Sequence, residues 1–90
     1  MSRYTLGADV ALVTVGVGAV VLNKRSGVYW QANETAARLL SAVQRGEAIE
    51  DCIQQISREF HQPMAIVAED ISRLVESLTR SGLIKHVLGS

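Results

Sequence analysis

The chain has little of several residue types whose abundance would place it in particular classes of protein. Cys52 is the single cysteine and Pro63 the single proline among its 90 residues. One cysteine excludes an internal disulfide, and it leaves a thiolate metal site without its usual second sulfur. A reducing cytoplasm is therefore the expected location. No Pro-, Ser- or Gly-rich stretch marks a linker, so we expect a single domain over residues 1–90.

An excess of charge of one sign is also missing. Nine basic and nine acidic residues cancel, so the chain lacks the global positive field that concentrates nucleic acids or anionic lipids around a binding protein. The apolar run from Ala8 to Leu22 contains Asp9, is too short to span a bilayer and precedes no cleavage site. We therefore expect no nucleic-acid partner, no membrane partner and no secretion.

Three segments have the composition of strands. Val10–Val15 and Ala19–Asn23 are rich in β-branched residues and flank Gly16-Val17-Gly18, which predicts a hairpin. The turn chemistry of NKRSG follows and leads into a third strand over Val28–Ala32. The prediction is a three-stranded antiparallel meander.

Three helices are expected after the strands. Asn33 can cap a first helix that Gly46 ends. A second helix is predicted from about Ala48 to Phe60, and a third from about Pro63 to Arg80, each with apolar residues at helical spacing. This order defines an α+β fold in which the sheet faces the helices on one side only. The residues expected to fold back onto the core after the last helix are Leu83, Ile84 and Val87.

No motif in the chain has the spacing that catalysis or metal binding needs. Gly16 and Gly18 lack the third glycine and the following helix of a dinucleotide fingerprint. Cys52 lies on the apolar face of the second helix, where a cysteine packs as a small hydrophobe. His61 and His86 belong to no ligand pattern. We expect no catalytic residue, no metal ligand, no cofactor and no enzymatic activity.

The helices from Glu47 to Arg80 have the order of a helix-turn-helix, so DNA binding is one alternative function. Phosphate contact favours an excess of Lys and Arg on the recognition helix. The third helix is instead net acidic, with two arginines against three carboxylates: Arg73 and Arg80 against Glu69, Asp70 and Glu76.

The third strand raises the question of what pairs with its outer edge. An open edge is a hazard unless it has a purpose, and one purpose is to receive an extended peptide as an added strand. Two alternatives remain: the segment from Leu83 to Leu88 covers the edge, or a second copy of the chain pairs with it in a homodimer.

Tyr29 and Trp30 are adjacent in that strand, so they point to opposite faces. We expect one of them to close the core and the other to line or flank a peptide cleft. On the third helix, a flank beside the core stripe mixes an apolar residue with both signs of charge, which suits a groove wall. Its members are Ile66, Asp70, Arg73 and Ser77.

The segment GAVVLNKRSGVYWQANETAARLL, from Gly18 to Leu40, and the later DISRLVESLTRSGLI, from Asp70 to Ile84, resemble the PqqD-like proteins. These are leader-peptide recognition elements (RiPP recognition elements) of ribosomally made, modified peptides. The similarity extends from about Val10 to Ile84. The specific combination is SG-x-Tyr-aromatic-x-x-Asn-x-Thr-Ala with a late Gly-Leu-Ile.

The resemblance implies a winged-helix-like domain whose third strand pairs with the leader of a precursor peptide and whose third helix forms the other wall of the cleft. The chain is most similar to the stand-alone members in lasso-peptide biosynthesis. Those members act as peptide chaperones and pass the leader to a cysteine protease, after which a cyclase closes the ring. A carrier for a radical SAM enzyme is the alternative within the family. The leader contacts it implies are Val28, Tyr29, Trp30, Gln31, Ile66, Asp70, Arg73, Leu74 and Ser77.

Overall fold

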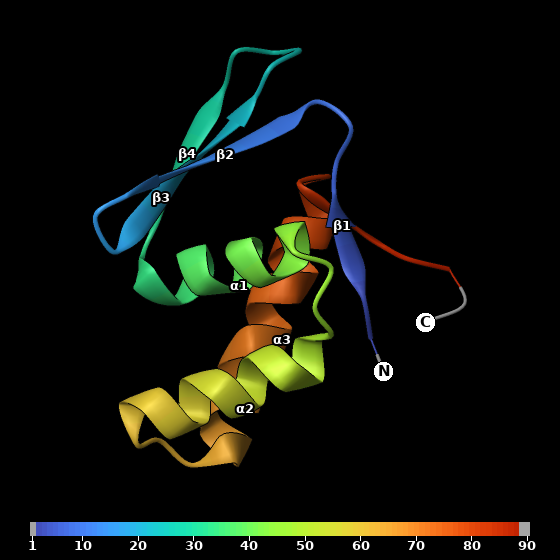
Figure 1. Ribbon diagram of the computed structural model, residues 1–90. Coiled ribbons are helices and arrows are strands. Elements are labelled where there is room, and N and C mark those ends of the chain that lie inside the picture. The colour runs from blue at the N-terminus through green and yellow to red at the C-terminus, as the bar shows by residue number, and fades with distance from the viewer. Residues whose placement is uncertain (1, 89–90) are drawn as a thin grey trace.

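Three strands form one antiparallel sheet in the order β2-β3-β4, at the top of Figure 1: β2 (Val10–Val15), β3 (Gly18–Asn23) and β4 (Tyr29–Ala32). The computed structural model describes residues 2–88 of the chain. Val15 pairs with Gly18, so Gly16 and Val17 make a two-residue turn, and Gly16 has the positive φ of 60° that this turn requires. The predicted meander is confirmed.

The three predicted helices are also present: α1 (Glu34–Gln44), α2 (Ile49–Phe60) and α3 (Met64–Arg80). Asn33 caps α1, because its side-chain oxygen accepts a hydrogen bond of 2.9 Å from the N–H of Ala36. Gly46, at a φ of 76°, follows the end of α1. Helix α3 begins at Met64, one residue later than expected, so Pro63 precedes the helix instead of opening it.

A second, two-stranded sheet was not predicted. It pairs β1 (Tyr4–Leu6) with β5 (Ile84–His86) in antiparallel register, with Thr5 opposite Lys85. The rings of Tyr4 and His86 meet edge to face, with centroids 5.1 Å apart. Figure 1 shows β1 beside the helices and separate from the larger sheet. Residues 2–88 thus form an α+β fold of two antiparallel sheets and three helices.

The core lies between one face of the larger sheet and the helices. Val21 supplies the sheet's fully buried side chain, and the opposite face carries exposed Val13 and Val15. Leu83 and Ile84 are buried as expected, whereas Val87 is 37% exposed, which corrects the expectation for that residue. The buried cluster comprises Val21, Leu39, Leu40, Ala42, Val43, Ile49, Cys52, Ile56, Val67, Ile71, Val75, Leu83 and Ile84.

The helices are short or amphipathic. None of those found in residues 2–88 combines the length and the apolar composition that crossing a bilayer requires.

Candidate functional site

β4 is an edge strand with an unpaired outer side. It pairs with β3 alone, and no other strand in residues 2–88 lies against its far edge. The segment after α3 pairs with β1 instead, so the alternative that residues 83–88 cover the β4 edge is wrong for the part of the chain that is described. The edge offers main-chain donors and acceptors to another chain.

The hydrogen-bond pattern fixes which residues offer those groups. The N–H of Asn23 donates to the carbonyl of Val28 at 2.9 Å, at the turn end of the β3–β4 ladder. Opposed residues in an antiparallel pair alternate between bonded and non-bonded positions. With Trp30 opposite Val21 and Gln31 opposite Val20, Trp30 bonds inward to β3. The N–H and C=O groups of Tyr29 and Gln31 therefore point outward from the sheet.

The two aromatic side chains lie on opposite faces, but neither closes the core. Trp30 is opposite buried Val21 and so lies on the helix-facing side, whereas Tyr29 is opposite Leu22 on the outer side. Trp30 is 38% exposed and Tyr29 64% exposed. The expectation that one of the pair closes the core is therefore wrong. An edge strand has no neighbour on its outer side to cover a large ring.

Helix α3 provides a second wall near the end of β4. A hollow of about 280 Å³ lies where the β4–α1 junction meets α3, and it brings together Asp70, Arg73 and Leu74 with Asn33 and Thr35. Leu74 packs against the core and forms the apolar part of this hollow. Asn33 and Thr35 were not among the predicted site residues. Their position directly after the strand is the sequence signal that marks them.

The remaining predicted residues of α3 lie on its exposed side. Ile66 is 52% exposed, and Ser77 is exposed one turn beyond Arg73. Neither lines the hollow. Val28 and Gln31 are exposed on or next to β4. The structure thus brings Asp70, Arg73 and Leu74 into one hollow and leaves Ile66 and Ser77 on the flank of the helix.

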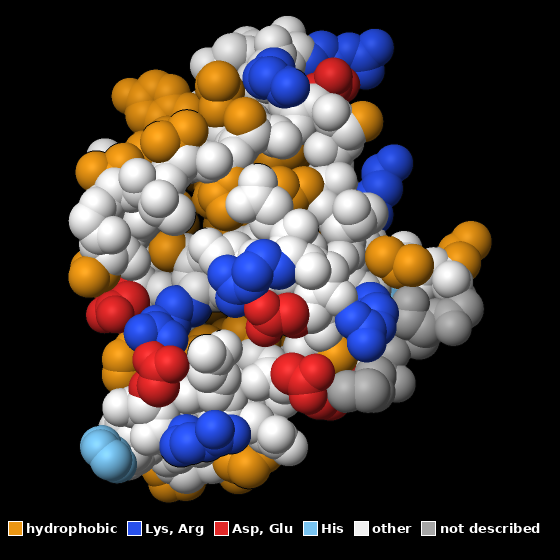
Figure 2. Space-filling model, viewed as in Figure 1, with side chains coloured by type: hydrophobic (Ala, Val, Ile, Leu, Met, Phe, Trp, Pro, Cys, Tyr) orange, Lys and Arg blue, Asp and Glu red, His pale blue; other side chains and the backbone are white. Residues whose placement is uncertain are grey.

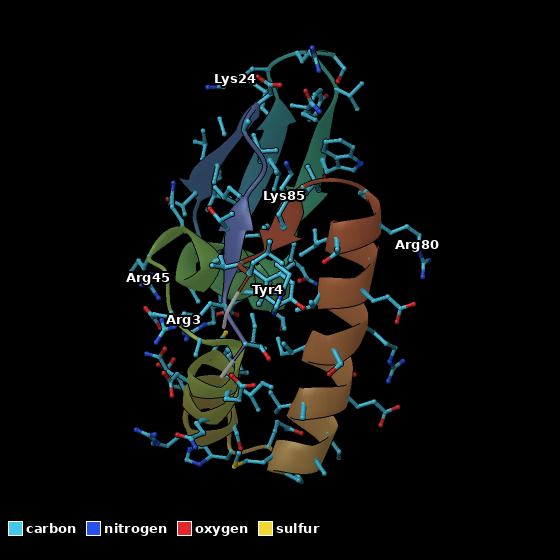
Figure 3. The ribbon with its side chains drawn as sticks, turned by 90° about the vertical axis from the view of Figure 1, so that its right-hand side faces the viewer. Arg3, Tyr4, Lys24, Arg45, Arg80 and Lys85 are labelled. Carbon is cyan, nitrogen blue, oxygen red and sulfur yellow. The ribbon has the colours of Figure 1, made fainter. Side chains whose placement is uncertain are left out.

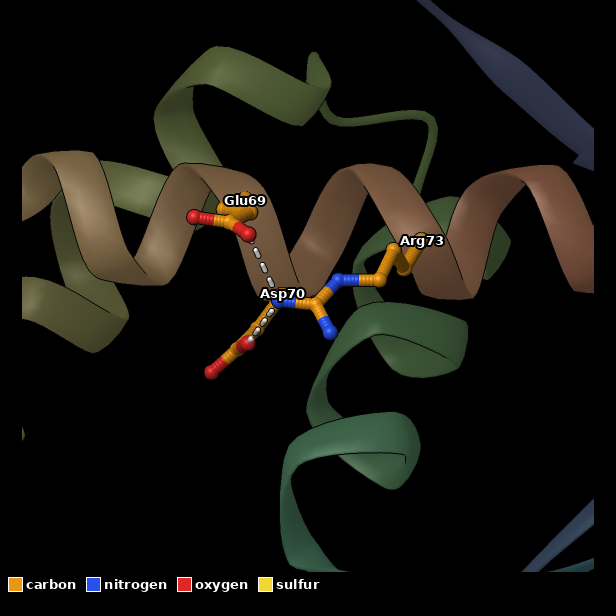
Figure 4. A network of polar contacts seen from close by, with 3 residues as sticks. All are labelled: Glu69, Asp70 and Arg73. Carbon is orange, nitrogen blue, oxygen red and sulfur yellow. Dashed lines mark hydrogen bonds and ion pairs between the residues drawn. The ribbon is translucent and has the colours of Figure 1, made fainter.

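The charged side chains at this hollow form ion pairs with one another. Arg73 donates to Glu69 at 2.9 Å and lies 3.4 Å from Asp70, as Figure 4 shows. Arg80, near the end of the same helix, pairs with Glu76 at 2.5 Å. Both arginines of α3 are therefore neutralised by carboxylates of their own helix. This arrangement disfavours phosphate contact and with it the alternative of DNA binding.

A second hollow, of about 310 Å³, lies between the β2–β3 turn and helices α1 and α2. Figure 2 shows this side of the molecule hollowed between the sheet and α1, with hydrophobic side chains inside. Its two arginines are paired, Arg38 with Glu59 at 2.6 Å and Arg45 with Glu47. Thr14 of β2, the other edge strand of the sheet, also lines this hollow. We favour the β4 edge for peptide binding because exposed Tyr29 and Trp30 lie on that strand and α3 forms a wall near its end.

Cys52 contributes to the wall of the second hollow and is 3% exposed. Burial, the largest cause, and the nearby Glu47 carboxylate raise the pKa of its thiol. A raised pKa disfavours the thiolate that a nucleophile or metal ligand needs. No group of three or more potential metal-binding side chains gathers within residues 2–88.

Comparison with known proteins identifies the class. Residues 18–84 match the model of the family described as coenzyme PQQ synthesis protein D (PqqD). The chain belongs to the PqqD family, and the resemblance seen in its sequence is confirmed. No curated protein matches the chain significantly.

Two solved structures have the same fold. One is described as lasso peptide synthetase B1 complexed with the leader peptide; it is 30% identical, with a TM-score of 0.83, over 92% of this chain and 98% of that one. The other, TbiB1 in complex with the TbiA(beta) leader peptide, is 18% identical, with a TM-score of 0.83, over 90% of this chain and 94% of that one. The second supports the fold alone.

Proposed function

We propose that this protein is a non-catalytic recognition element that binds the leader of a ribosomal precursor peptide as a strand added to β4. The observation that carries the proposal is the open β4 edge, with Tyr29 and Gln31 directed outward, beside the wall formed by α3. The solved relative at 30% identity is itself a complex with a leader peptide. Residues 1–90 act in this account as one leader-binding domain.

Strand addition explains both affinity and choice. Backbone pairing to Tyr29 and Gln31 supplies sequence-independent hydrogen bonds, and alternate side chains of the leader reach the adjacent surfaces. These surfaces are the helix-facing ring of Trp30, the hollow that Leu74 lines at the end of the strand, and Tyr29 on the outer face. The contacts proposed around them are Val28, Ile66, Asp70, Arg73 and Ser77. A free leader is disordered and loses conformational entropy when it binds, so part of the binding free energy from these contacts offsets that loss.

The role of such a complex is delivery. A leader held on this domain keeps the attached core peptide near any enzyme that binds the domain, which raises its effective concentration there. The enzymes we propose, as the resemblance to stand-alone members in lasso-peptide biosynthesis implies, are a leader peptidase of the cysteine protease class and a cyclase. The domain itself supplies no reacting group in this scheme.

The test of leader binding is a titration of the ¹⁵N-labelled protein with synthetic leader peptides, among them the one bound in the solved relative at 30% identity. The account expects 1:1 binding and shifts in the amide signals of Val28 to Gln31. Saturable binding that leaves those signals unmoved would reject the site. Delivery is tested separately, by measuring leader cleavage and ring closure by the purified enzymes with and without this protein. Equal rates in both reactions would contradict delivery.

A further inference from the structure

The net charge of the chain is zero, but the basic and acidic residues are unevenly distributed along it. Outside the helices, residues 2–33 and 81–88 carry a net side-chain charge of +3, from four cations and one carboxylate, Asp9. Residues 34–80 carry −3, from five cations and eight carboxylates. Figure 3 shows Lys24 at the tip of the larger sheet and Lys85 well below it on β5, near the middle of the molecule, whereas Arg3, Arg45 and Arg80 lie beside the helices. Two of the four cations, Lys24 and Arg25, lie in the turn at the tip of the larger sheet. The helical part of the chain is acidic.

The cations outside the helical part of the chain make no ion pair within residues 2–88, although Arg3 donates a hydrogen bond to the carbonyl of Gly46. The ion pairs within residues 2–88 occupy Arg38, Arg45, Arg73 and Arg80, all of them in or next to helices. Lys24, Arg25 and Lys85 make no ion pair within that range. Asp9 is joined to Lys24 through the backbone, where its carbonyl accepts from the Lys24 N–H at 2.7 Å, and not through its carboxylate.

Two of these cations lie where an added strand would end. Lys24 and Arg25 form the β3–β4 turn, and Val28, which accepts from Asn23, leads directly from that turn into the open edge. The side-chain oxygen of Asn23 accepts from the N–H of Arg25 at 2.9 Å and of Ser26 at 3.2 Å. The turn backbone is thus fixed by Asn23, which leaves both basic side chains exposed.

The other end of the edge has the opposite charge. Beside Asn33, the hollow contains Asp70 and Arg73, and Glu69 adjoins them, so this trio carries a net charge of −1. Tyr29–Ala32 is only four residues long, so at about 3.3 Å per residue the two ends are roughly 10 Å apart. One short peptide strand therefore meets both ends.

We propose that Lys24 and Arg25 form an ion-pairing site that selects peptides with acidic residues at the end of the strand lying beside the β3–β4 turn. This inference rests on the proposed strand addition and adds a charge requirement to its ligand. Exposed charges at the rim of an interface act mainly on association rate and partner choice. Each such pair is individually weak, so the preference is graded and salt-sensitive.

The probe is a phage-displayed library of random twelve-residue peptides, selected at low salt on the intact protein and on the K24Q/R25Q variant. Glutamine keeps the turn backbone, whose bonds involve Asn23 and not the two basic side chains. The matched control is R45Q/R58Q, which removes two exposed cations from the helical half. The expected result is several-fold enrichment of Asp and Glu at one end of the selected peptides, lost in K24Q/R25Q and retained in R45Q/R58Q.

Affinity and binding site are then measured with the selected peptides. Their affinity is expected to fall about two- to tenfold in K24Q/R25Q, with less dependence on salt than in the parent protein. Selected peptides that shift the Val28 to Gln31 amides but show no acidic preference, or the same preference in K24Q/R25Q, would overturn this inference and leave strand addition intact. Peptides that bind elsewhere, or no enrichment at all, would overturn both. A DNA duplex that binds at Lys24 and Arg25 and displaces the peptides would show that the basic turn serves nucleic acid instead.

Discussion

Trp30 lies directly opposite Val21 across the β3–β4 ladder, yet Val21 is 1% exposed and Trp30 38% exposed. Partners across an antiparallel pair share a face, so both side chains point toward the helices. Val21 is on the central strand and is covered on both sides, whereas Trp30 is on the edge. The exposed part of its indole is available to a strand added beyond β4.

The position of Trp30 gives a direct optical test, because it is the only tryptophan in the chain. Binding of the leader should cover its ring and move the emission maximum to shorter wavelength, with the change saturating at one equivalent. Fluorescence titration of the purified protein measures this. Binding established by calorimetry without any change in emission would place the ligand away from Trp30.

The alternation of the ladder predicts opposite results for proline at adjacent positions. Gln31→Pro removes an outward N–H that β3 does not use, so it should weaken leader binding about tenfold or more, with a small effect on unfolding. Trp30→Pro removes an N–H that bonds to β3 and leaves the partner carbonyl unpaired, so it should lower the free energy of unfolding by about 1–3 kcal/mol. Denaturant melts and binding titrations of both variants check the pair. Full leader affinity in a folded Gln31→Pro protein would contradict strand addition.

The sequence predicted the large elements because their signals are long or chemically specific. The valine-rich hairpin, the Asn33 cap and the apolar stripe of α3 each involve several consistent residues. β1 and β5 have three residues each, too few for a period to be recognised, and their pairing joins opposite ends of the chain. The sequence therefore predicted that Leu83 and Ile84 return to the core but not that the segment pairs with β1.

The candidate site was predicted in outline and not in detail. Adjacent Tyr29 and Trp30 had to face opposite ways, but only the register with Val21 and Leu22 assigns their faces. The incomplete burial of Trp30 follows from its edge position, which is a property of the sheet and not of the local sequence. Asn33 and Thr35 enter the hollow because α3 packs near the β4–α1 junction, a tertiary relationship that local patterns do not encode.

His61 ends α2 in the left-handed conformation, with a φ of 53°. A residue with a side chain is strained there, whereas glycine is not. We expect His61→Gly to stabilise the protein by about 0.5–1 kcal/mol in chemical denaturation. Gln62→Gly is the matched control, because Gln62 lacks a positive φ and should lose stability. The opposite order of the two variants would contradict this account of the α2 end.

The thiol of Cys52 should react slowly with iodoacetamide at pH 8. Burial raises its pKa, and the thiolate fraction and the access of the reagent are both reduced in the folded protein. A raised pKa for an acidic group also means that ionisation opposes folding, so stability should decline as the pH rises above the usual thiol range. Mass spectrometry of alkylation with and without denaturant tests the first point. Rapid modification of the folded chain would contradict it.

The outward direction of the Tyr29 and Gln31 main-chain groups is the central claim, and amide hydrogen exchange measured residue by residue tests it most directly. In the free protein, the amides of Tyr29 and Gln31 should exchange quickly and those of Trp30 and Ala32 slowly. Saturation with the leader should slow Tyr29 and Gln31 by an order of magnitude or more, since each N–H then gains a partner. Slow exchange at Tyr29 and Gln31 before the leader is added, or no slowing after it binds, would contradict the account.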